Sequence, residues 1–268
     1  MTYRFAVTRT DHSDFATGRV FYGLPGHPAF PVRLADEIFQ RCLALHGSAA
    51  PGGVTLYDPC CGSASLLGAI AYLHWSRVRA VVASDIDPEV LPLAARNLSL
   101  LTQQGLEERR AQITTLRALY GKESHAAALD SVGHLQERLA AGLAAHAIPT
   151  RLFAADATDA SAILAAVAPG AVDLVITDLP YGQRSAWQSG PGHELSAGDA
   201  LEALLQALRP VLAPRAIVAI VSDKAQRPRH RAYRRAGWFG VGHRRVEFLR
   251  MLAHDWASGD PGASFRVE

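Results

Sequence analysis

The chain has 268 residues, 49% of them hydrophobic and 19% charged, and its formal net charge at pH 7 is only +2. A chain of this length and composition can bury a full hydrophobic core, which is typical of one large globular domain or of one domain with additions. It contains neither an export signal nor an apolar run of the roughly 18 residues that a membrane-spanning helix needs. We therefore expect a cytoplasmic globular protein.

Residues 1–53 are predicted to form an N-terminal extension, and residues 54–257 to form the main domain. In the extension, an irregular Gly/Pro stretch precedes an amphipathic helical pattern. Farther along, apolar patterns of strand and helix period alternate. The predicted strands are Val54–Tyr57, Ala80–Ala83, Arg151–Ala154, Val172–Thr177, Ala216–Val221 and Arg245–Leu252. The predicted helices are Leu34–Leu45, Leu66–His74, Glu89–Leu101 and Asp199–Leu208.

Two features depart from simple alternation. An insert of about residues 101–149 has apolar residues at helical spacing, which predicts a helical hairpin broken near Tyr120–Gly121. The last strand follows Gly237–Gly240, which we interpret as a hairpin turn, so this strand adds an antiparallel edge. The tail 258–268 is short, polar and glycine-containing, and we expect disorder there. The fold class is therefore α/β, with a Rossmann-like, doubly wound, mostly parallel sheet.

A glycine-containing turn, Asp58–Ser63, follows the first strand and precedes a helical pattern. Such a turn places backbone N–H groups against a bound cofactor. Asp85 ends the second strand, roughly 20 residues beyond the turn, where a carboxylate accepts the hydroxyl groups of an adenosine ribose. Because the turn lacks the G-x-G-x-x-G pattern of a pyrophosphate site, the sequence favours S-adenosylmethionine (SAM) over a dinucleotide.

The residues after the third strand complete the predicted cofactor site. Asp156 is placed to accept from an adenine amino group, and capping of the following helix is the alternative. The cysteines Cys42, Cys60 and Cys61 fit neither a disulfide framework nor a zinc site, so we expect no metal. The predicted cofactor-binding residues from these segments are Asp58, Cys60, Cys61, Gly62, Ser63, Asp85, Ile86, Asp156 and Ala157.

A second segment, Thr177–Gly182, follows the apolar strand that begins at Val172. It contains a carboxylate, a carbonyl flanked by proline and an aromatic ring, which together can bind a planar base by its amino group. We therefore predict as catalytic residues Asp178, Leu179, Pro180 and Tyr181. A turn-forming aspartate and a core tyrosine are the alternatives.

Basic residues gather between Lys224 and Arg250, where nine of them stand against the single acid Glu247. This strip predicts contact with a nucleic-acid phosphate backbone, and a solvated arginine-rich face is the alternative. The loop after the second segment also faces the substrate in this interpretation, although its tryptophan could instead cover the core. The predicted RNA-contacting residues are Arg184, Trp187, Arg234, Arg235, Arg244 and Arg245.

These segments carry a family resemblance. The chain resembles class I SAM-dependent methyltransferases of the group whose fourth motif reads Asn/Asp-Pro-Pro-Tyr/Phe, here Asp178–Tyr181. More narrowly, it is similar over most of residues 20–225 to the avilamycin-resistance methyltransferases that modify guanine N2 in 23S ribosomal RNA. Two positions depart from the pattern, since Ala64 replaces a usual second glycine and Leu179 replaces the first proline. The narrower resemblance rests on Phe30–Leu34, Asp58–Ser63, Ser84–Pro88 and Thr177–Gly182.

The resemblance implies SAM as cofactor and 23S rRNA or the large ribosomal subunit as partner. It also implies resistance to an orthosomycin antibiotic such as avilamycin, and an ion pair between Arg33 and the cofactor carboxylate; an exposed charge at the helix N-terminus is the alternative for Arg33. Asp178 and the Leu179 carbonyl would accept the two N–H bonds of an exocyclic amine while Tyr181 stacks on the base. We expect a monomer.

Two other functions remain open from the sequence. A DNA adenine or protein glutamine N-methyltransferase uses the same fourth motif, and a nonenzymatic RNA-binding module would also explain the basic strip. The strip favours nucleic acid over a protein substrate, and the intact motifs favour an enzyme.

Overall fold

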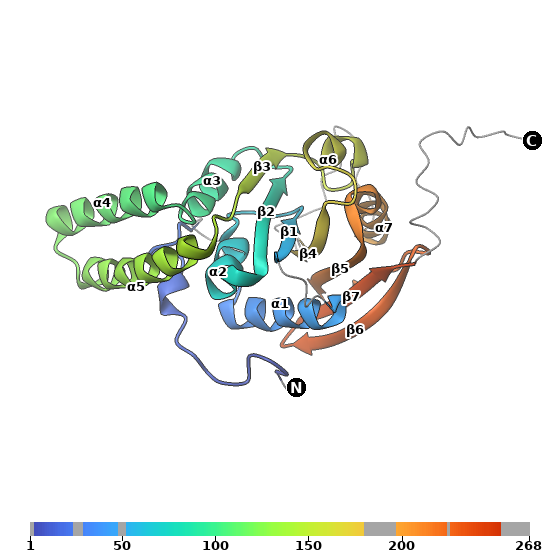
Figure 1. Ribbon diagram of the computed structural model, residues 1–268, viewed down its shortest axis with the longest axis horizontal. Coiled ribbons are helices and arrows are strands. Elements are labelled where there is room, and N and C mark those ends of the chain that lie inside the picture. Colours follow the sequence, from blue (N-terminus) through green and yellow to red (C-terminus); the bar gives the residue numbers. More distant parts are fainter. Residues whose placement is uncertain (1–2, 24–28, 48–51, 180–196, 224–225, 253–268) are drawn as a thin grey trace, which may run out of the picture.

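The computed structural model describes residues 3–23, 29–47, 52–179, 197–223 and 226–252. Its centre is a seven-stranded sheet in the order β3-β2-β1-β4-β5-β7-β6 (Figure 1). The strands are β1 Val54–Asp58, β2 Val78–Asp85, β3 Thr150–Ala154, β4 Val172–Asp178, β5 Leu212–Asp223, β6 Tyr233–Val241 and β7 Arg244–Met251. The helices are α1 Val32–His46, α2 Ser65–Leu73, α3 Leu91–Ser99, α4 Gln103–Tyr120, α5 Glu123–Ala145, α6 Ala160–Ala166 and α7 Ala197–Leu208.

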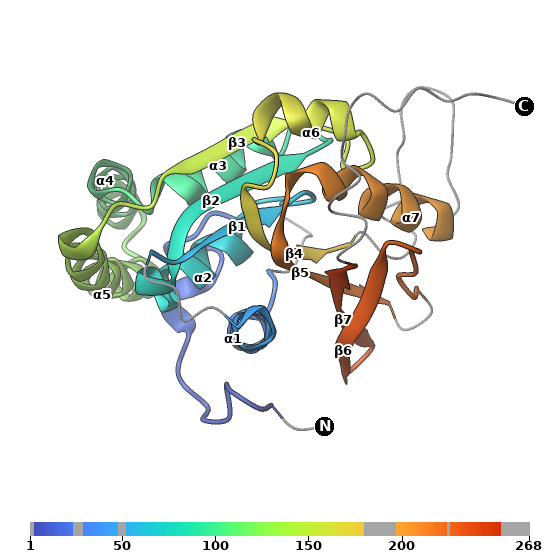
Figure 2. The same cartoon turned by 45° about the vertical axis from the view of Figure 1, so that its right-hand side comes forward.

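Helices cover both faces of the sheet (Figure 2). Residues of α1, α2 and α3 share one hydrophobic core with one face, and residues of α6 and α7 share a second core with the other. Strands β1 to β5 are parallel, and β1 is buried along its whole length, as apolar strands between two helical layers are. The predicted doubly wound α/β fold is confirmed. No helix in the described ranges is long and apolar enough to cross a membrane.

The C-terminal hairpin differs from its prediction. Two antiparallel strands, β7 and β6, extend the sheet instead of one, and β6 forms the edge. The predicted turn Gly237–Gly240 is wrong, because these residues lie within β6 and the chain reverses at Gly242 and His243. Gly242 has a φ of +57°, which a tight hairpin turn requires, whereas Gly237 marks a register irregularity in the ladder.

The inserted residues form the predicted helical hairpin, α4 and α5, which extends away from the sheet (Figure 1). The break at Tyr120–Gly121 is confirmed, since α4 ends at Tyr120 and Gly121 has a φ of +59°. The base of α5 packs on Trp75, whose Nε1 donates to the carbonyl oxygen of His146 at 2.9 Å. A Cβ on Gly142 would lie 2.5 Å from the Trp75 ring, so the helix can approach this closely only because residue 142 is glycine.

The residues before β1 pack into the same core as the sheet. Phe21 and Phe39, both fully buried, belong to the core cluster that includes β1 and α2. Glu37, also fully buried, accepts hydrogen bonds of 2.7–2.8 Å from the backbone N–H groups of Arg4, Phe5 and Ala6. This carboxylate therefore fixes the N-terminal segment against α1. The limits of the N-terminal extension and the main domain stay a prediction.

Two glycine substitutions in α5 should have opposite effects on stability. Gly142→Ala is expected to lower the free energy of unfolding by about 1–3 kcal/mol, because the added methyl group collides with Trp75. Gly133→Ala, where the same methyl group meets open space in the same helix, should raise it by up to about 1 kcal/mol. Urea denaturation of both variants measures the difference, and equal effects of the two changes would contradict the tight packing of α5 on Trp75.

Candidate active site

Four aspartates lie at one edge of the sheet, where its parallel strands end. Asp58, Asp85 and Asp178 are the last residues of β1, β2 and β4, and Asp156 comes shortly after β3. The chain leaves β1 toward β2 on one side and leaves β4 toward β5 on the other. A ligand crevice opens at such a switch point in doubly wound sheets. The structure thus brings together the four acids that the sequence proposes for the site.

The turn after β1 is held by the side chains of two of these acids. Cys60 N donates to Asp58 Oδ1 at 3.1 Å, and Gly62 N donates to Asp85 Oδ2 at 2.8 Å. Gly62 has a φ of +51°, which glycine adopts without strain. The second Asp85 oxygen, Oδ1, accepts from Asp87 N at 3.1 Å. Since each carboxylate oxygen has two lone pairs, Asp85 can still accept hydroxyl groups of a ligand.

Ala64, which replaces the usual second glycine of the family pattern, has a left-handed backbone conformation that is typical of glycine. Its φ of +55° makes it the one non-glycine residue with a positive φ in the described ranges. A left-handed conformation costs a residue with a Cβ roughly 1–2 kcal/mol. Its N–H donates to the Cys61 carbonyl at 2.7 Å, and α2 begins at the next residue. The alanine at this position therefore stores strain in the turn.

Burial raises the pKa values of titratable groups in this cluster. Asp58 is only 2% exposed, and burial raises its pKa to about 7, with the charges of Asp85 and Asp178 adding to the shift. Burial and the same acidic surroundings hold the pKa of the Cys60 thiol well above its ordinary value. The thiol therefore stays protonated and is a poor nucleophile or metal ligand. The site suits a cationic ligand. Among the described residues, no cluster of histidine, cysteine and acidic side chains could hold a metal ion.

Asp156 and Ala157 lie in the loop between β3 and α6. Asp156 Oδ1 accepts from the backbone N–H and the hydroxyl of Thr158 at 2.8 and 2.7 Å. The cap of α6 is Asp159, which accepts from the first helical N–H groups, so the alternative role of Asp156 as a helix cap is wrong. Ala157 is buried, and Ile86, after β2, is 39% exposed. A ligand contact of Asp156 stays a prediction.

Asp178 has the features of a substrate-facing acid. In the described part of the chain, its buried Oδ1 atom has no hydrogen-bond partner. Burial raises the pKa of Asp178 to about 6, and the nearby Arg244 guanidinium opposes this shift. Leu179 is buried, and its N–H donates to the carbonyl of Val221 at 2.9 Å, which fixes the strand end. Unpaired buried carboxylate oxygens are costly, so this atom is ready to accept a hydrogen bond.

Several predicted residues cannot be placed. Pro180, Tyr181, Arg184 and Trp187 lie outside the described residues. Their assignments to base binding and RNA contact stay predictions.

Arg33 has contacts within the protein. Its Nε donates to Ala6 O at 2.9 Å, a terminal nitrogen donates to Val7 O at 2.8 Å, and the guanidinium lies 4.2 Å from the ring centre of Tyr3. These contacts attach the N-terminal segment to α1. The predicted ion pair with a cofactor carboxylate stays a prediction.

Asn97 belongs to the site region, although the sequence reasoning missed it. Its fully buried amide donates to the Ser63 carbonyl at 2.8 Å and exchanges hydrogen bonds with the backbone of Tyr22. It therefore connects the cofactor turn to the N-terminal segment. The sequence feature that could have indicated Asn97 is its position as a lone amide on the buried face of the predicted helix Glu89–Leu101.

The predicted basic strip divides on the hairpin. Arg244 lies at the carboxyl edge beside Asp178, whereas Arg234 pairs with Arg250 near the opposite end of β7. Arg245 donates to the buried Glu247 and packs over the Trp238 ring at 4.2 Å. The side chains of neighbouring strand residues point to opposite faces, so Arg234 and Arg235 do not form one contact surface. Tyr233 is buried, with its hydroxyl donating to Leu205 O.

Comparisons with known proteins identify the family. The family model described as rRNA methyltransferase AviRa matches residues 1–244. A 23S rRNA (guanine(2535)-N(1))-methyltransferase of Streptomyces viridochromogenes is 44% identical over 226 residues, 84% of this chain and 86% of that protein. The chain belongs to the AviRa family of rRNA methyltransferases. Two solved structures of AviRa from the same organism, each 39% identical, cover 97% of this chain and 100% of theirs, with TM-scores of 0.82 and 0.83.

The family membership confirms the predicted resemblance and the methyltransferase fold. One detail differs, because the Streptomyces relative is named for guanine N1, whereas the sequence prediction was an N2 enzyme. The two atoms are neighbours on the same edge of guanine. They differ chemically, since N1 carries a single proton within the ring and N2 is an exocyclic amine.

Without ligand, Asp58→Asn is expected to stabilise the fold at pH 8 and to leave it unchanged at pH 4. The folded-state pKa of about 7 exceeds the ordinary 3.8, so the wild type loses stability as the pH rises between these values. The neutral amide avoids this loss, which amounts to about 2–4 kcal/mol. Urea denaturation at both pH values measures it, with Asp87→Asn at an exposed position as control. Equal stability of Asp58→Asn and wild type at pH 8 would argue against the raised pKa.

Proposed function

We propose that this protein transfers a methyl group from SAM to a ring-edge nitrogen of a guanine in 23S rRNA. The observation that carries the proposal is the buried Asp178 Oδ1 atom, which has no hydrogen-bond partner among the described residues and lies at the same sheet edge as Asp58 and Asp85. The second support is that the chain belongs to the AviRa family and is 44% identical to a 23S rRNA guanine methyltransferase. This family setting favours an RNA substrate over DNA adenine, protein glutamine or a nonenzymatic RNA-binding role.

The residues present fit SAM. Bound SAM would supply an electrophilic methyl group on a positively charged sulfur. In this proposal Asp85, whose carboxylate has lone pairs left beside the bond from Gly62, accepts from the ribose hydroxyls, and the buried Asp58 carboxylate pairs with the cationic amino group. The turn Cys60–Ser63 presents its backbone to the ligand, while Ile86, Asp156 and Ala157 surround the adenine in this assignment.

Asp178 is proposed to orient the guanine and to accept its proton. A nitrogen whose lone pair is delocalised into the ring is a weak nucleophile, so removal of its proton makes attack easier. With a pKa of about 6, Asp178 is mostly ionised at neutral pH and can accept the N1 proton as the new N–C bond forms. This property favours N1, the atom in the relative's name, over N2. The Leu179 carbonyl and the Tyr181 ring are the proposed partners of the guanine edge and face.

Methylation on the Watson–Crick edge changes the shape and the hydrogen bonding of a ribosomal site. We propose that this change confers resistance to an orthosomycin antibiotic such as avilamycin. The partner is 23S rRNA, either free or within the large ribosomal subunit, and a monomer is the proposed active form.

Asp85→Ala should weaken SAM binding about ten- to a hundredfold. Hydrogen bonds to a charged group are worth about 1.5–3 kcal/mol, and the variant also loses the acceptor that holds Gly62. Calorimetric titration with SAM measures the effect. Asp87→Ala, in the same loop but exposed, is the control and should bind SAM within about threefold of wild type. An unchanged SAM affinity in Asp85→Ala would show that another residue binds the ribose.

Asp178→Asn should retain SAM binding and lose methyl transfer by about a hundredfold or more, since general-base catalysis contributes roughly 10²–10⁴-fold. In the wild type, kcat should fall as the pH drops below about 6, where Asp178 takes up a proton. Asp173→Asn changes an acid at the opposite end of β4 and is the matched control. Kinetics with 23S rRNA at several pH values test this role, which a wild-type rate in Asp178→Asn would rule out.

A further inference from the structure

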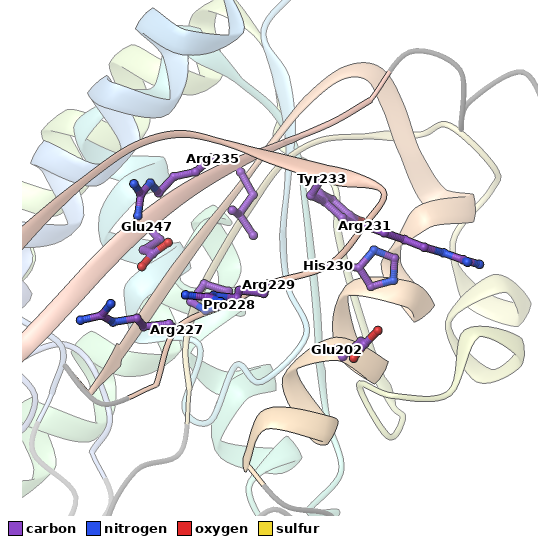
Figure 3. A pocket seen from close by; sticks show the side chains of 10 residues that line it. Glu202, Arg227, Pro228, Arg229, His230, Arg231, Tyr233, Arg235 and Glu247 are labelled. Atoms are coloured by element: carbon purple, nitrogen blue, oxygen red, sulfur yellow. The ribbon is translucent and has the colours of Figure 1, made fainter.

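A cavity lies on the α7 side of the C-terminal hairpin (Figure 3). Its volume is about 500 Å³. It is enclosed by α7, by the loop before β6 and by one face of β6 and β7. Side chains that matter for its chemistry are Glu202, Arg227, Arg229, Arg231, Arg235 and Glu247. Nothing in the proposed methyl transfer uses it.

The loop that forms one wall is anchored at several points. His230 Nδ1 accepts from Ala232 N at 3.0 Å, so its Nε2 donates to Gln206 on α7 at 3.1 Å. The Tyr233 hydroxyl donates to Leu205 O at 2.8 Å, and Pro228 within the loop is buried. Because these contacts fix the backbone, the cavity is preformed, as ligand sites usually are.

Some arginines elsewhere in the protein are attached to neighbouring segments by hydrogen bonds. Arg33, Arg109 and Arg250 each donate to backbone carbonyls of neighbouring segments. By contrast, within the described residues no hydrogen bond or ion pair is found for the guanidinium groups that line the cavity. Figure 3 shows Arg227, Arg229 and Arg235 gathered around Glu247, while Arg231 points to the other side of the loop.

The acids of the cavity do not neutralise this cluster. Glu247 is 2% exposed and already forms an ion pair with Arg245. Glu202 lies on α7, below His230 in the view of Figure 3 and not beside Glu247. Like charges around one cavity repel one another unless an anion binds among them. The cavity therefore has the charge and shape for phosphate groups.

An aromatic surface adjoins the arginines. Trp238 pairs with Glu247 across the hairpin, which puts its ring on the cavity face, and it is 53% exposed. Trp238 and Arg235 pair with Glu247 and Leu249 on the cavity face of the hairpin, whereas Arg244, which lies beside Asp178, is on the opposite face of β7. Arginines together with an exposed aromatic ring are the elements of a surface for single-stranded nucleic acid.

We propose that this face holds the RNA strand next to the target guanine, with phosphates on Arg227, Arg229 and Arg235 and a base on Trp238. The inference rests on the proposed rRNA methyl transfer and adds to it a route for the substrate backbone. The inference assigns an RNA contact to Arg235 and none to Arg234, because the Arg234 side chain is on the opposite face of β6.

The first test measures binding of a 23S rRNA fragment at several salt concentrations. The triple variant Arg227→Ala, Arg229→Ala, Arg235→Ala should bind roughly ten- to a hundredfold more weakly at 0.1 M salt. Each lost phosphate contact should lower the slope of log affinity against log salt by about 0.7, or by about two in total. KM for RNA should rise, whereas kcat and SAM affinity should stay near wild type, which shows that the variant is folded.

The matched control compares single variants of neighbouring residues. Arg235→Ala should lower the salt slope by about 0.7, and Arg234→Ala, with the same loss of charge, should leave it unchanged. Trp238→Ala should weaken binding about five- to a hundredfold at every salt concentration without changing the slope, and Trp238→Phe should restore most of the affinity.

The outcomes separate this inference from the proposed function. If the wild type methylates 23S rRNA and the triple variant keeps the wild-type salt slope, the inference is wrong and the proposed function stands. An equal decrease of the salt slope in Arg234→Ala and Arg235→Ala would also overturn the inference alone. A wild type that neither binds nor methylates the RNA overturns both. Suppression of wild-type binding by inorganic phosphate at low millimolar concentration, with no response in the triple variant, supports phosphate recognition by these arginines.

Discussion

The carboxylate of Asp85 joins the two loops on which the crevice depends. One oxygen accepts from Gly62 in the turn after β1, and the other accepts from Asp87 in the loop after β2. Cys61 N in the first loop also donates to the carbonyl oxygen of Ser84 in β2 at 2.9 Å, so the backbone and carboxylate bonds together fix the direction of the remaining N–H groups. The same carboxylate adds to the field that raises the pKa of Asp58. Asp85 therefore contributes to the structure of this edge and, together with the larger effect of burial, to its electrostatics.

The site combines features that would be unfavourable in a core without a ligand. Asp58 and Asp178 are buried carboxyl groups with raised pKa values, and Asp178 Oδ1 has no partner among the described residues. Ala64 holds a left-handed conformation in the cofactor turn. Groups of this kind cluster at functional sites because ligand binding recovers the energy they cost. In our account, a cationic cofactor balances Asp58 and a guanine N–H satisfies Asp178.

The α/β fold and the position of the acids at the sheet edge could be predicted from the sequence, because each acid closely follows a strand pattern. Asp85 and Asp178 each end an apolar run, so their places at the carboxyl edge follow from strand direction. The hairpin turn was misplaced because three glycines compete there and only Gly242 has the required positive φ. The opposite facing of Arg234 and Arg235 follows from strand alternation, but no predicted strand included these two residues. The burial of Arg109 depends on its contacts with the distant carbonyls of Arg19 and Val20, which local patterns do not contain. Asn97 was missed for the same reason.

The central claim is methyl transfer to one guanine nitrogen of 23S rRNA, and mass mapping of that RNA tests it most directly. Purified protein would be incubated with unmodified 23S rRNA and isotopically labelled SAM, and nuclease fragments would be sequenced by mass spectrometry. Our account predicts one labelled methyl group on a single guanine, at N1, and no label when SAM is omitted. Labelled methyl groups on a base other than guanine, or none on RNA that the protein binds together with SAM, would contradict it.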